Sequence, residues 1–310
     1  MKTYEKGLVS VIIPTYKRSD LLQKAIDSVL NQTYRKIQLI VVNDNTIGDE
    51  YSQKLYKLID NIQDDRLLFL EQEKHINGAA ARNCGIRAAK GEFIAFLDDD
   101  DYWDANKLEV QLERFAKLDN SWGAVACLIR QYNNQKLSSV SLPYKEGNLL
   151  MPILCRTVGL GTGAVLIRRE ALDDAGYFDE TLMRHQDLQL FAGIAAKNKI
   201  ALVKKYLHNI EIKDAQNRPS AEKMAAIKKA YFQSISPIMN SLSAAKQKQV
   251  HIMNEFECAY SYYRAGQKKK ALKSTVGIFR SPATLLMAAK KVIKRILSRR
   301  GFEARLKKYS

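Results

Sequence analysis

The stretch FIAFLDDDDYW (residues 93–103) decides the fold prediction, because a short apolar run enters four consecutive aspartates. The apolar half is typical of a buried β-strand. Adjacent carboxylates repel one another and raise each other's pKa values. The cluster therefore needs a partner that neutralises its charge. Its place at the end of a strand favours a functional site over a purely structural loop.

A divalent cation would provide that partner. Mg²⁺ and Mn²⁺ bind carboxylate oxygens and keep positions open for phosphate oxygens. On an extended strand end Asp98 and Asp100 would point the same way, as metal ligands, and Asp99 the other way, toward a ribose hydroxyl. The alternative is an acidic loop in which Asp101 or Asp104 caps the next helix.

Apolar runs and helical segments alternate through the first hundred residues. The expected strands are residues 8–14, 37–44, 67–72 and 93–98. Ser19 is the expected N-cap of the first helix. The strands are apolar throughout, which favours an α/β fold with a mainly parallel sheet sandwiched by helices. Ligands of such sheets bind beyond the carboxyl ends of the strands. We therefore expect Pro14, Thr15, Tyr16, Asp44 and the aspartates to share one crevice.

The second half of the chain continues the sheet and then becomes helical. Further strands are expected within residues 123–132, 161–168 and 200–210, and a helix is expected to begin near Asp187. A polar, proline-containing stretch predicts a boundary near residue 215, and Gly266 is expected at the turn of a helical hairpin. The predicted units are residues 1–215, 216–281 and 282–310.

Positive charge is concentrated in the C-terminal tail. The net charge is +17 over 310 residues, but residues 265–310 hold fourteen Lys and Arg and a single Glu. Residues 282–310 form a basic amphipathic pattern, typical of a helix that lies on an anionic membrane surface. The alternative is a helix packed on the body with a solvated basic face. The cations lack interleaved aromatic residues, so no nucleic-acid partner is expected.

Other sequence features bound the location of the protein. The N-terminus has too short an apolar run for a secretory signal peptide. No run of 18 apolar residues predicts a membrane-spanning helix. The four widely spaced cysteines fit reduced thiols better than a disulfide framework or a zinc site.

Four blocks in order resemble the motifs of family 2 glycosyltransferases with the GT-A fold. The blocks are VSVIIPTYKR, IVVNDNTIGD, ARNCGIRAAKGEFIAFLDDDDYW and RHQDLQLF, and the resemblance covers about residues 8–220. The family moves a sugar from a nucleotide-sugar donor to an acceptor hydroxyl with inversion of the anomeric centre. The resemblance thus implies a GT-A-type fold with a helical C-terminal region, and a hexosyltransferase-like activity.

The resemblance also assigns residues to the donor. It implies that Tyr16, after Pro14 and Thr15, lies against the nucleotide base, and that Asp44 binds the base and suits uracil. The family usually has two aspartates where this chain has Asn43-Asp44. Arg82 and Asn83 match a block that serves the nucleotide or orders the crevice. Asp98 and Asp100 match the metal-binding D-x-D motif, with Asp99 near the ribose; His208 is a further candidate metal ligand.

Asp187 matches the catalytic base of the family. The usual pair is Glu-Asp, and this chain has Gln186-Asp187. A carboxylate there would take the proton of the acceptor hydroxyl, and a metal would offset the charge on the leaving diphosphate. The resemblance places Thr162 and Gly163 on the acceptor side, and His185 is a further candidate there.

Together, the residues and the resemblance lead us to expect an inverting glycosyltransferase that uses Mn²⁺ or Mg²⁺. Its donor is expected to be a UDP-sugar and its acceptor a glycan or lipid-linked glycan of surface polysaccharide synthesis. We expect it in the cytoplasm, attached peripherally to the inner face of the cytoplasmic membrane. A sugar nucleotidyltransferase would need a glycine-rich phosphate loop, which PTYKRSD is not. A phospho-acceptor receiver domain would leave the second half unexplained, and a non-catalytic GT-A-like domain stays an alternative.

Overall fold

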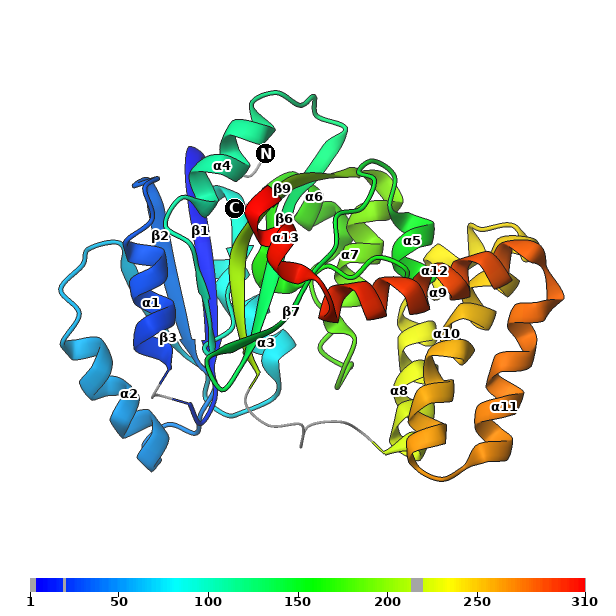
Figure 1. The fold of residues 1–310 in the computed structure, drawn as a ribbon. Helices are drawn as coiled ribbons and strands as arrows, with labels where there is room; N and C mark the ends of the chain where they lie inside the picture. Colours follow the sequence, from blue (N-terminus) through cyan, green and yellow to red (C-terminus); the bar gives the residue numbers. More distant parts are fainter. Residues whose placement is uncertain (1–3, 19–20, 213–219, 310) are drawn as a thin grey trace.

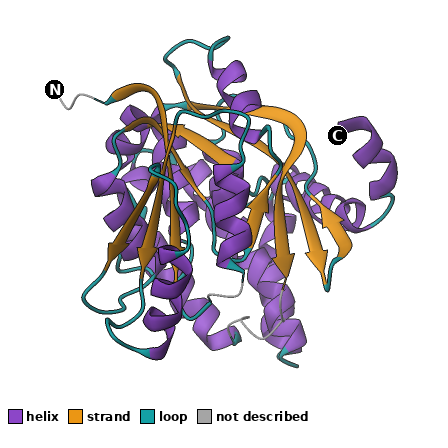
Figure 2. Ribbon diagram, turned by 90° about the vertical axis from the view of Figure 1, so that its left-hand side faces the viewer, coloured by secondary structure: helices purple, strands orange, loops and turns teal. Residues whose placement is uncertain are grey.

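The computed structural model describes residues 4–18, 21–212 and 220–309. They form a sheet covered by helices on both faces, followed by a helical region on one side (Figure 1; Figure 2). The sheet has nine strands, in the order β3-β2-β1-β4-β8-β6-β9-β5, with β7 paired to β6. Ser19 and the boundary expected near residue 215 lie outside the described residues, so the helix cap and the three-unit division stay predictions.

The first half of the sheet is parallel, as its apolar strands predict. Its strands are β1 (Glu5–Thr15), β2 (Ile37–Asn43), β3 (Leu67–Glu71) and β4 (Gly91–Phe96). They are joined by α1 (Leu22–Leu30), α2 (Glu50–Asp60) and α3 (Gly78–Ala88). Each strand pairs in parallel register with its neighbour, for example Val11 with Leu39 and Ala95. Their carboxyl ends therefore meet at one edge of the sheet.

The second half is largely antiparallel, so the sheet is mixed rather than mainly parallel. β8 (Val165–Arg168) runs antiparallel between β4 and β6 (Trp122–Asn133), and β9 (Lys199–Ile212) lies parallel to β6. Two short strands were not expected from the sequence: β5 (Asp101–Trp103), paired with β9, and β7 (Lys136–Val140), paired with β6. β5 depends on pairing with the distant β9, whereas β7 forms a hairpin with the end of β6.

The aspartate run is a turn, which corrects the extended geometry expected for it. The backbone N–H of Asp101 donates to the carbonyl oxygen of Asp98 at 3.1 Å. Asp104 does not cap the next helix, α4 (Lys107–Phe115), whose N-cap is Asn106. The Asp104 carboxylate instead accepts from Arg130 at 3.0 Å. The run is thus folded back onto the sheet edge rather than into the helix.

Helix α3 packs unusually close to the central strand. A Cβ on Gly85 would lie 2.5 Å from Cγ2 of Ile12 on β1, so only glycine permits this approach. The close packing fixes the start of α3 over the carboxyl edge of the sheet. Arg82 and Asn83 on this helix are thereby held beside the aspartate turn.

The rest of the chain packs beside the sheet as short and long helices. They are α5 (Leu150–Leu154), α6 (Arg169–Ala175), α7 (Gln186–Lys197), α8 (Ala221–Ser234), α9 (Ser236–Asn240), α10 (Ala244–Arg264), α11 (Lys268–Val276), α12 (Pro282–Arg299) and α13 (Phe302–Tyr309). The α10–α11 hairpin is confirmed, with Gly266 at a φ of +73° in its turn. Tyr231, Met253 and Ala288 of this region belong to the same apolar core as Ile12.

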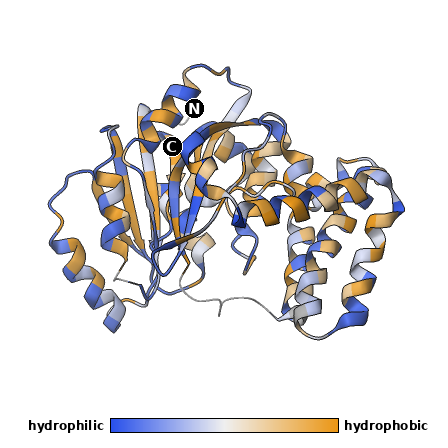
Figure 3. Ribbon diagram, in the orientation of Figure 1, coloured by the Kyte–Doolittle hydropathy of each residue, from blue (hydrophilic) through white to orange (hydrophobic). Residues whose placement is uncertain are grey.

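Helix α12 packs on the body with its apolar face outward. Thr284 and Ala288 are buried on its inner face, and Lys291 and Lys294 also face the body. Apolar residues recur along the helix (Figure 3). Those that remain exposed are Leu285, Leu286, Val292, Ile293, Ile296 and Leu297. The tail therefore fits neither expected arrangement fully, since it docks on the body yet leaves its apolar face in solvent. Within the described residues, no helix has the length and apolar character needed to cross a bilayer.

Glu257 on α10 binds the helical region to the sheet domain. Its carboxylate pairs with Arg156 at 3.0 Å, with Lys228 of α8 at 2.9 Å and with Lys291 of α12 at 3.8 Å. Burial alone would raise the pKa of Glu257, but the three cations outweigh it and hold that pKa far below its ordinary value. One carboxylate thus joins three segments.

We predict that Glu257→Gln destabilises the protein by about 3 kcal/mol, because three half-buried cations lose their counter-charge. The folded-state pKa is depressed, so this stabilisation is complete above the pKa of an unfolded glutamate, about 4.3, and is lost as the pH falls through the lower folded value. Urea unfolding from neutral to acid pH measures both effects. Glu255→Gln, an exposed carboxylate on the same helix, is the matched control. Equal midpoints for the two variants would contradict the assignment.

Candidate active site

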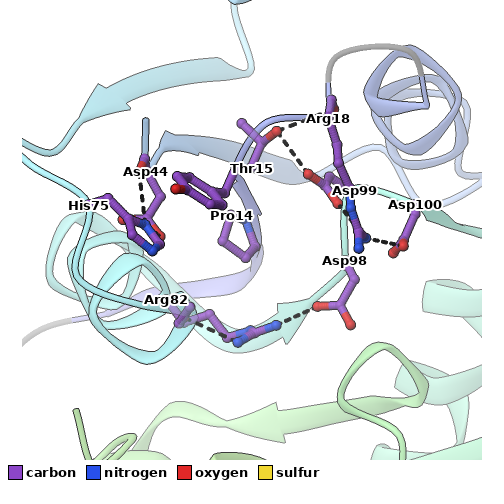
Figure 4. Close-up of a pocket in the computed structure, with 11 residues that line it drawn as sticks. Pro14, Thr15, Arg18, Asp44, His75, Arg82, Asp98, Asp99 and Asp100 are labelled. Atoms are coloured by element: carbon purple, nitrogen blue, oxygen red, sulfur yellow. Dashed lines mark hydrogen bonds and ion pairs between the residues drawn. The ribbon is translucent and has the colours of Figure 1, made fainter. Parts of the chain in front are cut away.

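A cleft of about 440 Å³ lies at the carboxyl ends of β1, β2 and β4 (Figure 4). We call it the donor cleft; its lining residues are Pro14, Thr15, Tyr16, Arg18, Asp44, His75, Gly78, Arg82, Asp98, Asp99 and Asp100. The expected convergence of the strand ends on one crevice is confirmed. The size is in the range of small-molecule and cofactor sites.

The three aspartates that line the donor cleft pair with groups from two segments. Asp98 pairs with Arg82 of α3, and Asp100 pairs with Arg18 in the segment after β1 (Figure 4). Asp99 accepts a hydrogen bond from the hydroxyl of Thr15 at 2.9 Å, and its Oδ1 lies 3.7 Å from Arg18. Asp99 and Asp100 thus share Arg18 while Asp98 faces another cation, which differs from the expected grouping of Asp98 with Asp100. The repulsion inherent in the sequence is relieved by the end of β1 with the residues after it, and by α3.

The pKa values of Asp98 and Asp99 are shifted in opposite directions. Burial, with the neighbouring Asp100, raises the pKa of Asp99 to about 7. Partial burial would also raise the pKa of Asp98, but the charge of Arg82 outweighs it and holds that pKa below its ordinary value. Asp98 therefore stays ionised near neutral pH, as a carboxylate that binds a cation must.

The donor set fits a hard divalent cation. Asp98 and Asp100 present carboxylate oxygens to one cleft, and both already neutralise a cationic side chain there. Within the described residues there is no group of three or more His, Cys, Asp or Glu that could hold a metal. A cation at Asp98 and Asp100 would thus take its other ligands from water or from a bound phosphate.

His208 lies behind this cleft rather than in it. The ring is buried, and its Nε2 is 2.9 Å from Oδ2 of Asp101. Burial lowers the pKa of His208 to about 3, and burial with the charges of Asp98 and Asp100 raises the pKa of Asp101, so the two form a neutral hydrogen-bonded pair. A Cβ on Gly163 would lie 2.6 Å from His208 Nε2, so a larger residue at position 163 would clash with the buried ring. His208 thus pairs with Asp101 and is not among the residues that line the donor cleft.

The other end of the donor cleft is formed by two stacked aromatic rings and the carboxylate of Asp44. The rings of Tyr16 and His75 stack with centroids 3.8 Å apart and an angle of 13° between their planes. His75 Nδ1 is 2.9 Å from Oδ2 of Asp44, and Gln72 donates to Oδ1 at 2.8 Å. Burial raises the pKa of Asp44, and His75 opposes this rise. A flat ring can stack here beside a carboxylate whose orientation is fixed.

A second cleft of about 350 Å³ adjoins the first and contains Asp187. We call it the acceptor cleft; its lining residues are Arg82, Asp98, Thr162, Phe178, Met183, Arg184, His185, Gln186 and Asp187. Arg82 and Asp98 line both clefts, so their ion pair forms the shared wall. Asp187 is therefore within reach of a molecule that touches the aspartate turn.

Burial gives Asp187 a more basic carboxylate than an exposed aspartate has. The residue is in the first turn of α7, where the N–H of Leu188 stabilises the carboxylate. Burial raises the pKa of Asp187, and the charge of Arg156 opposes the rise. His185, at the N-cap with a φ of +66°, has a buried Nδ1 without a hydrogen-bond partner among the described residues. Burial lowers the pKa of His185 to about 3, so its ring is neutral.

Asn83 orders a loop beside the clefts, which is one of the two roles expected for it, and its contact with the nucleotide stays a prediction. Its Nδ2 donates to the carbonyl of Phe178 at 2.9 Å and to Glu180 at 2.8 Å, and its Oδ1 accepts from the Phe178 N–H. Asn83 does not line either cleft. It instead holds the loop that leads to Asp187.

Sequence reasoning missed three residues that shape the clefts: Arg18, His75 and Arg156. Arg18 was visible at the end of the first block, close after Pro14, where a cation could face the aspartates. His75 and Arg156 lie in irregular segments without a periodic signal. Only the folded chain brings His75 to Asp44 and Arg156 near Asp187.

Comparison with known proteins identifies relatives of this architecture. A family model described as glycosyl transferase family 2 matches residues 10–176. The Escherichia coli protein WfgD, named a UDP-Glc:alpha-D-GlcNAc-diphosphoundecaprenol beta-1,3-glucosyltransferase, is 31% identical over 200 residues, 63% of this chain and 73% of WfgD. The chain spans less than two thirds of the length of other curated relatives, for example 29% of an uncharacterized glycosyltransferase from Rickettsia bellii and 34% of one from Rickettsia felis.

Solved structures share the fold at low sequence identity. Residues 1–349 of S. aureus TarS, in complex with UDP-GlcNAc, match with a TM-score of 0.64 at 16% identity, over 96% of this chain and 91% of that one. The mannosyltransferase PcManGT from Pyrobaculum calidifontis, in complex with GDP-Man and Mn²⁺, matches with a TM-score of 0.57 at 18% identity, over 94% and 86%. The GT-A-type fold with a helical C-terminal region is confirmed.

We predict that Asn83→Ala loosens the loop before α7. The carbonyl of Phe178 and its N–H would lose their partner, which costs about 1–3 kcal/mol. Hydrogen exchange should become faster for residues 178–187, with little change in β1 and β2. Asn61→Ala, which removes an exposed bond to the carbonyl of Lys57, is the control. Unchanged exchange in the loop would show that Asn83 does not hold it.

Proposed function

The chain belongs to glycosyl transferase family 2, and from that premise we propose that it transfers a sugar from a UDP-sugar to an acceptor hydroxyl. The observation that carries the proposal is the wall of Arg82 and Asp98 shared by the two clefts. A donor whose diphosphate lies at the aspartate turn would place its sugar next to Asp187. The bound donor sugar and the carboxylate that removes the acceptor proton would then be next to each other.

The donor cleft suits a uridine diphosphate. The uracil ring would stack at Tyr16, and Asp44 would accept its N–H. A divalent cation, Mn²⁺ or Mg²⁺, would be held by Asp98 and Asp100, and it supplies positive charge to the diphosphate when bound. The TarS complex with UDP-GlcNAc supports a UDP-sugar donor, and the PcManGT complex with GDP-Man and Mn²⁺ supports a divalent cation.

Asp187 would act as the general base for the acceptor. Its carboxylate takes the hydroxyl proton as the oxygen forms a bond to the anomeric carbon. The bond from that carbon to the diphosphate oxygen breaks at the same time, and its electron pair leaves with the UDP. Attack from the face opposite the leaving group inverts the anomeric centre. Arg82 and Arg18 add fixed positive charge near the leaving diphosphate.

The acceptor would be a glycan or a lipid-linked glycan of surface polysaccharide synthesis. The name of WfgD, which specifies a sugar linked to diphosphoundecaprenol, supports this class. A lipid-linked acceptor would lie in the cytoplasmic leaflet of the membrane. The enzyme would therefore work at the inner face of that membrane.

Helix α12 would dock there through its exposed apolar face. Ile293 is 54% exposed and Leu286 is also 54% exposed, an unfavourable arrangement in water. Cations follow this face in the sequence, at the end of α12 and along α13; they are Arg299, Arg300, Lys307 and Lys308. Apolar insertion combined with attraction to anionic headgroups is the physical basis of interfacial helices.

Calorimetry with UDP and GDP, each with and without Mn²⁺, tests the donor proposal. We expect UDP to bind more tightly than GDP and to need Mn²⁺. Asp100→Asn should weaken metal-dependent UDP binding by about tenfold or more, because one charged ligand becomes a neutral amide. Binding of neither nucleotide would withdraw the proposal.

Asp187→Asn should keep UDP binding and lose about 10²–10⁴-fold in transfer rate. In the parent, transfer should decrease as the pH falls through the raised pKa of Asp187, because only the ionised carboxylate accepts a proton. The assay is transfer from UDP-sugar to a diphosphate-linked sugar acceptor, followed from neutral to acid pH. Transfer by the variant at the parental rate would exclude Asp187 as the base.

Ile293→Asp should weaken binding to vesicles of phosphatidylcholine and phosphatidylglycerol by about tenfold, because the carboxylate would enter the interface. Ile47→Asp is the matched control, since Ile47 is 52% exposed and distant in sequence. Cosedimentation measures both. Equal vesicle binding by the two variants would remove α12 from the contact surface.

A further inference from the structure

A third pocket, of about 250 Å³, lies between the sheet domain and helix α12. We call it the α12 pocket. Its lining residues are Cys127, Ile129, Ser141, Leu142, Tyr144, Thr157, Val158, Gly159, Leu160, Gly161, Ala164, Lys294, Arg295 and Ser298. None of these residues belongs to the donor or the acceptor cleft.

The walls of the α12 pocket have two chemical characters. Strand β6 and the loop before β8 contribute an apolar floor, which includes Ile129, Val158 and Leu160. Helix α12 contributes two cations at the opposite wall. Lys294 donates only a long hydrogen bond of 3.3 Å to a backbone carbonyl, and the guanidinium of Arg295 lies 4.5 Å from the centre of the Tyr260 ring. Neither cation has a carboxylate partner in these contacts.

Tyr144 adds a polar atom that lacks a partner. Its hydroxyl is buried, and no hydrogen bond to it is found among the described residues. Burial raises the pKa of Tyr144, so the hydroxyl keeps its proton and is available to donate. A buried donor without an acceptor is costly. A ligand with an oxygen acceptor would remove that cost.

The surroundings of the pocket indicate an amphipathic ligand near the acceptor. The exposed apolar residues Ile293, Ile296 and Leu297 are neighbours of Lys294 and Arg295 on the same helix. The loop of residues 157–161 lines the α12 pocket, and the next residue, Thr162, lines the acceptor cleft with Asp187. The α12 pocket therefore adjoins the loop of the acceptor cleft, and its cations come from the helix whose outer face is apolar.

We propose that the α12 pocket binds the phosphate-bearing end of a membrane lipid, with the phosphate at Lys294, Arg295 and the Tyr144 hydroxyl and the hydrocarbon on the apolar floor. The proposal rests on the proposed function, because the lipid that would need such a site is the carrier of the acceptor. It assigns α12 a part in substrate binding as well as in docking. Phosphate oxygens suit both the cations and the orphan donor.

Calorimetric titration with farnesyl diphosphate, a soluble prenyl diphosphate, tests the site in the full chain. UDP and Mn²⁺ are kept at saturation so that the donor cleft is occupied. We expect farnesyl diphosphate to bind and inorganic diphosphate to bind at least about tenfold more weakly. Lys294→Gln with Arg295→Gln should weaken farnesyl diphosphate binding by about tenfold or more. Lys290→Gln with Lys307→Gln, which removes the same charge from exposed positions, should leave it unchanged.

Tyr144→Phe separates a ligand contact from a structural role. The hydroxyl has no partner to lose, so the thermal midpoint should be unchanged or higher. Farnesyl diphosphate affinity should nevertheless decrease by about fivefold. Unchanged affinity, or an equal loss in the Lys290 and Lys307 control, would overturn the site.

The remaining outcomes separate this proposal from the proposed function. Absent farnesyl diphosphate binding with normal UDP binding overturns the α12 pocket alone. Absent UDP binding overturns the proposed function, whatever the lipid result. Dihexanoyl phosphatidylglycerol that binds as tightly as farnesyl diphosphate, with the same dependence on Lys294 and Arg295, would assign the pocket to bulk phospholipid and overturn its role for the acceptor carrier.

Discussion

Four adjacent carboxylates at the end of β4 impose the electrostatic constraint on which the rest of the site depends. Their partners come from distant parts of the chain: Arg82 from α3, Thr15 and Arg18 from the end of β1 and the residues after it, and His208 from β9. These pairings hold the carboxyl edge of the sheet together. The charge of Arg82 keeps Asp98 ionised, whereas burial and the neighbouring carboxylates raise the pKa values of Asp99 and Asp101.

Helix α3 positions the residues that relate the donor cleft to the acceptor cleft. Gly85 lets the helix lie against Ile12, which places Arg82 where it can line both clefts and Asn83 where it can hold the loop before Asp187. One helix thus sets the position of the aspartate turn relative to the candidate base. A family 2 glycosyltransferase needs that relation, because the sugar must be between a leaving diphosphate and a base.

Ion pairs connect the sheet domain to helix α12, whose apolar face is exposed. Glu257 pairs with Arg156, Lys228 and Lys291, so that helix α12 and the arginine whose charge acts on Asp187 share one ionic network. Lysines of α12 consequently face the body, and its apolar residues face outward. Burying lysine and exposing isoleucine is unfavourable for a helix surrounded by water alone. The membrane docking proposed for α12 would cover this outer face.

The sequence by itself determined the strand-forming runs, the alternation of strands and helices in the first half, and the convergence of Tyr16, Asp44 and the aspartates. These follow from local apolar periodicity and from the rule that parallel strands end together. Only the tertiary structure decided the antiparallel second half, the turn at Asp98–Asp101, the stacking of His75 and the outward apolar face of α12. The physical reason is that strand pairing, ion pairing and helix orientation depend on partners far away in the sequence. A local sequence pattern does not specify which distant residues those partners are.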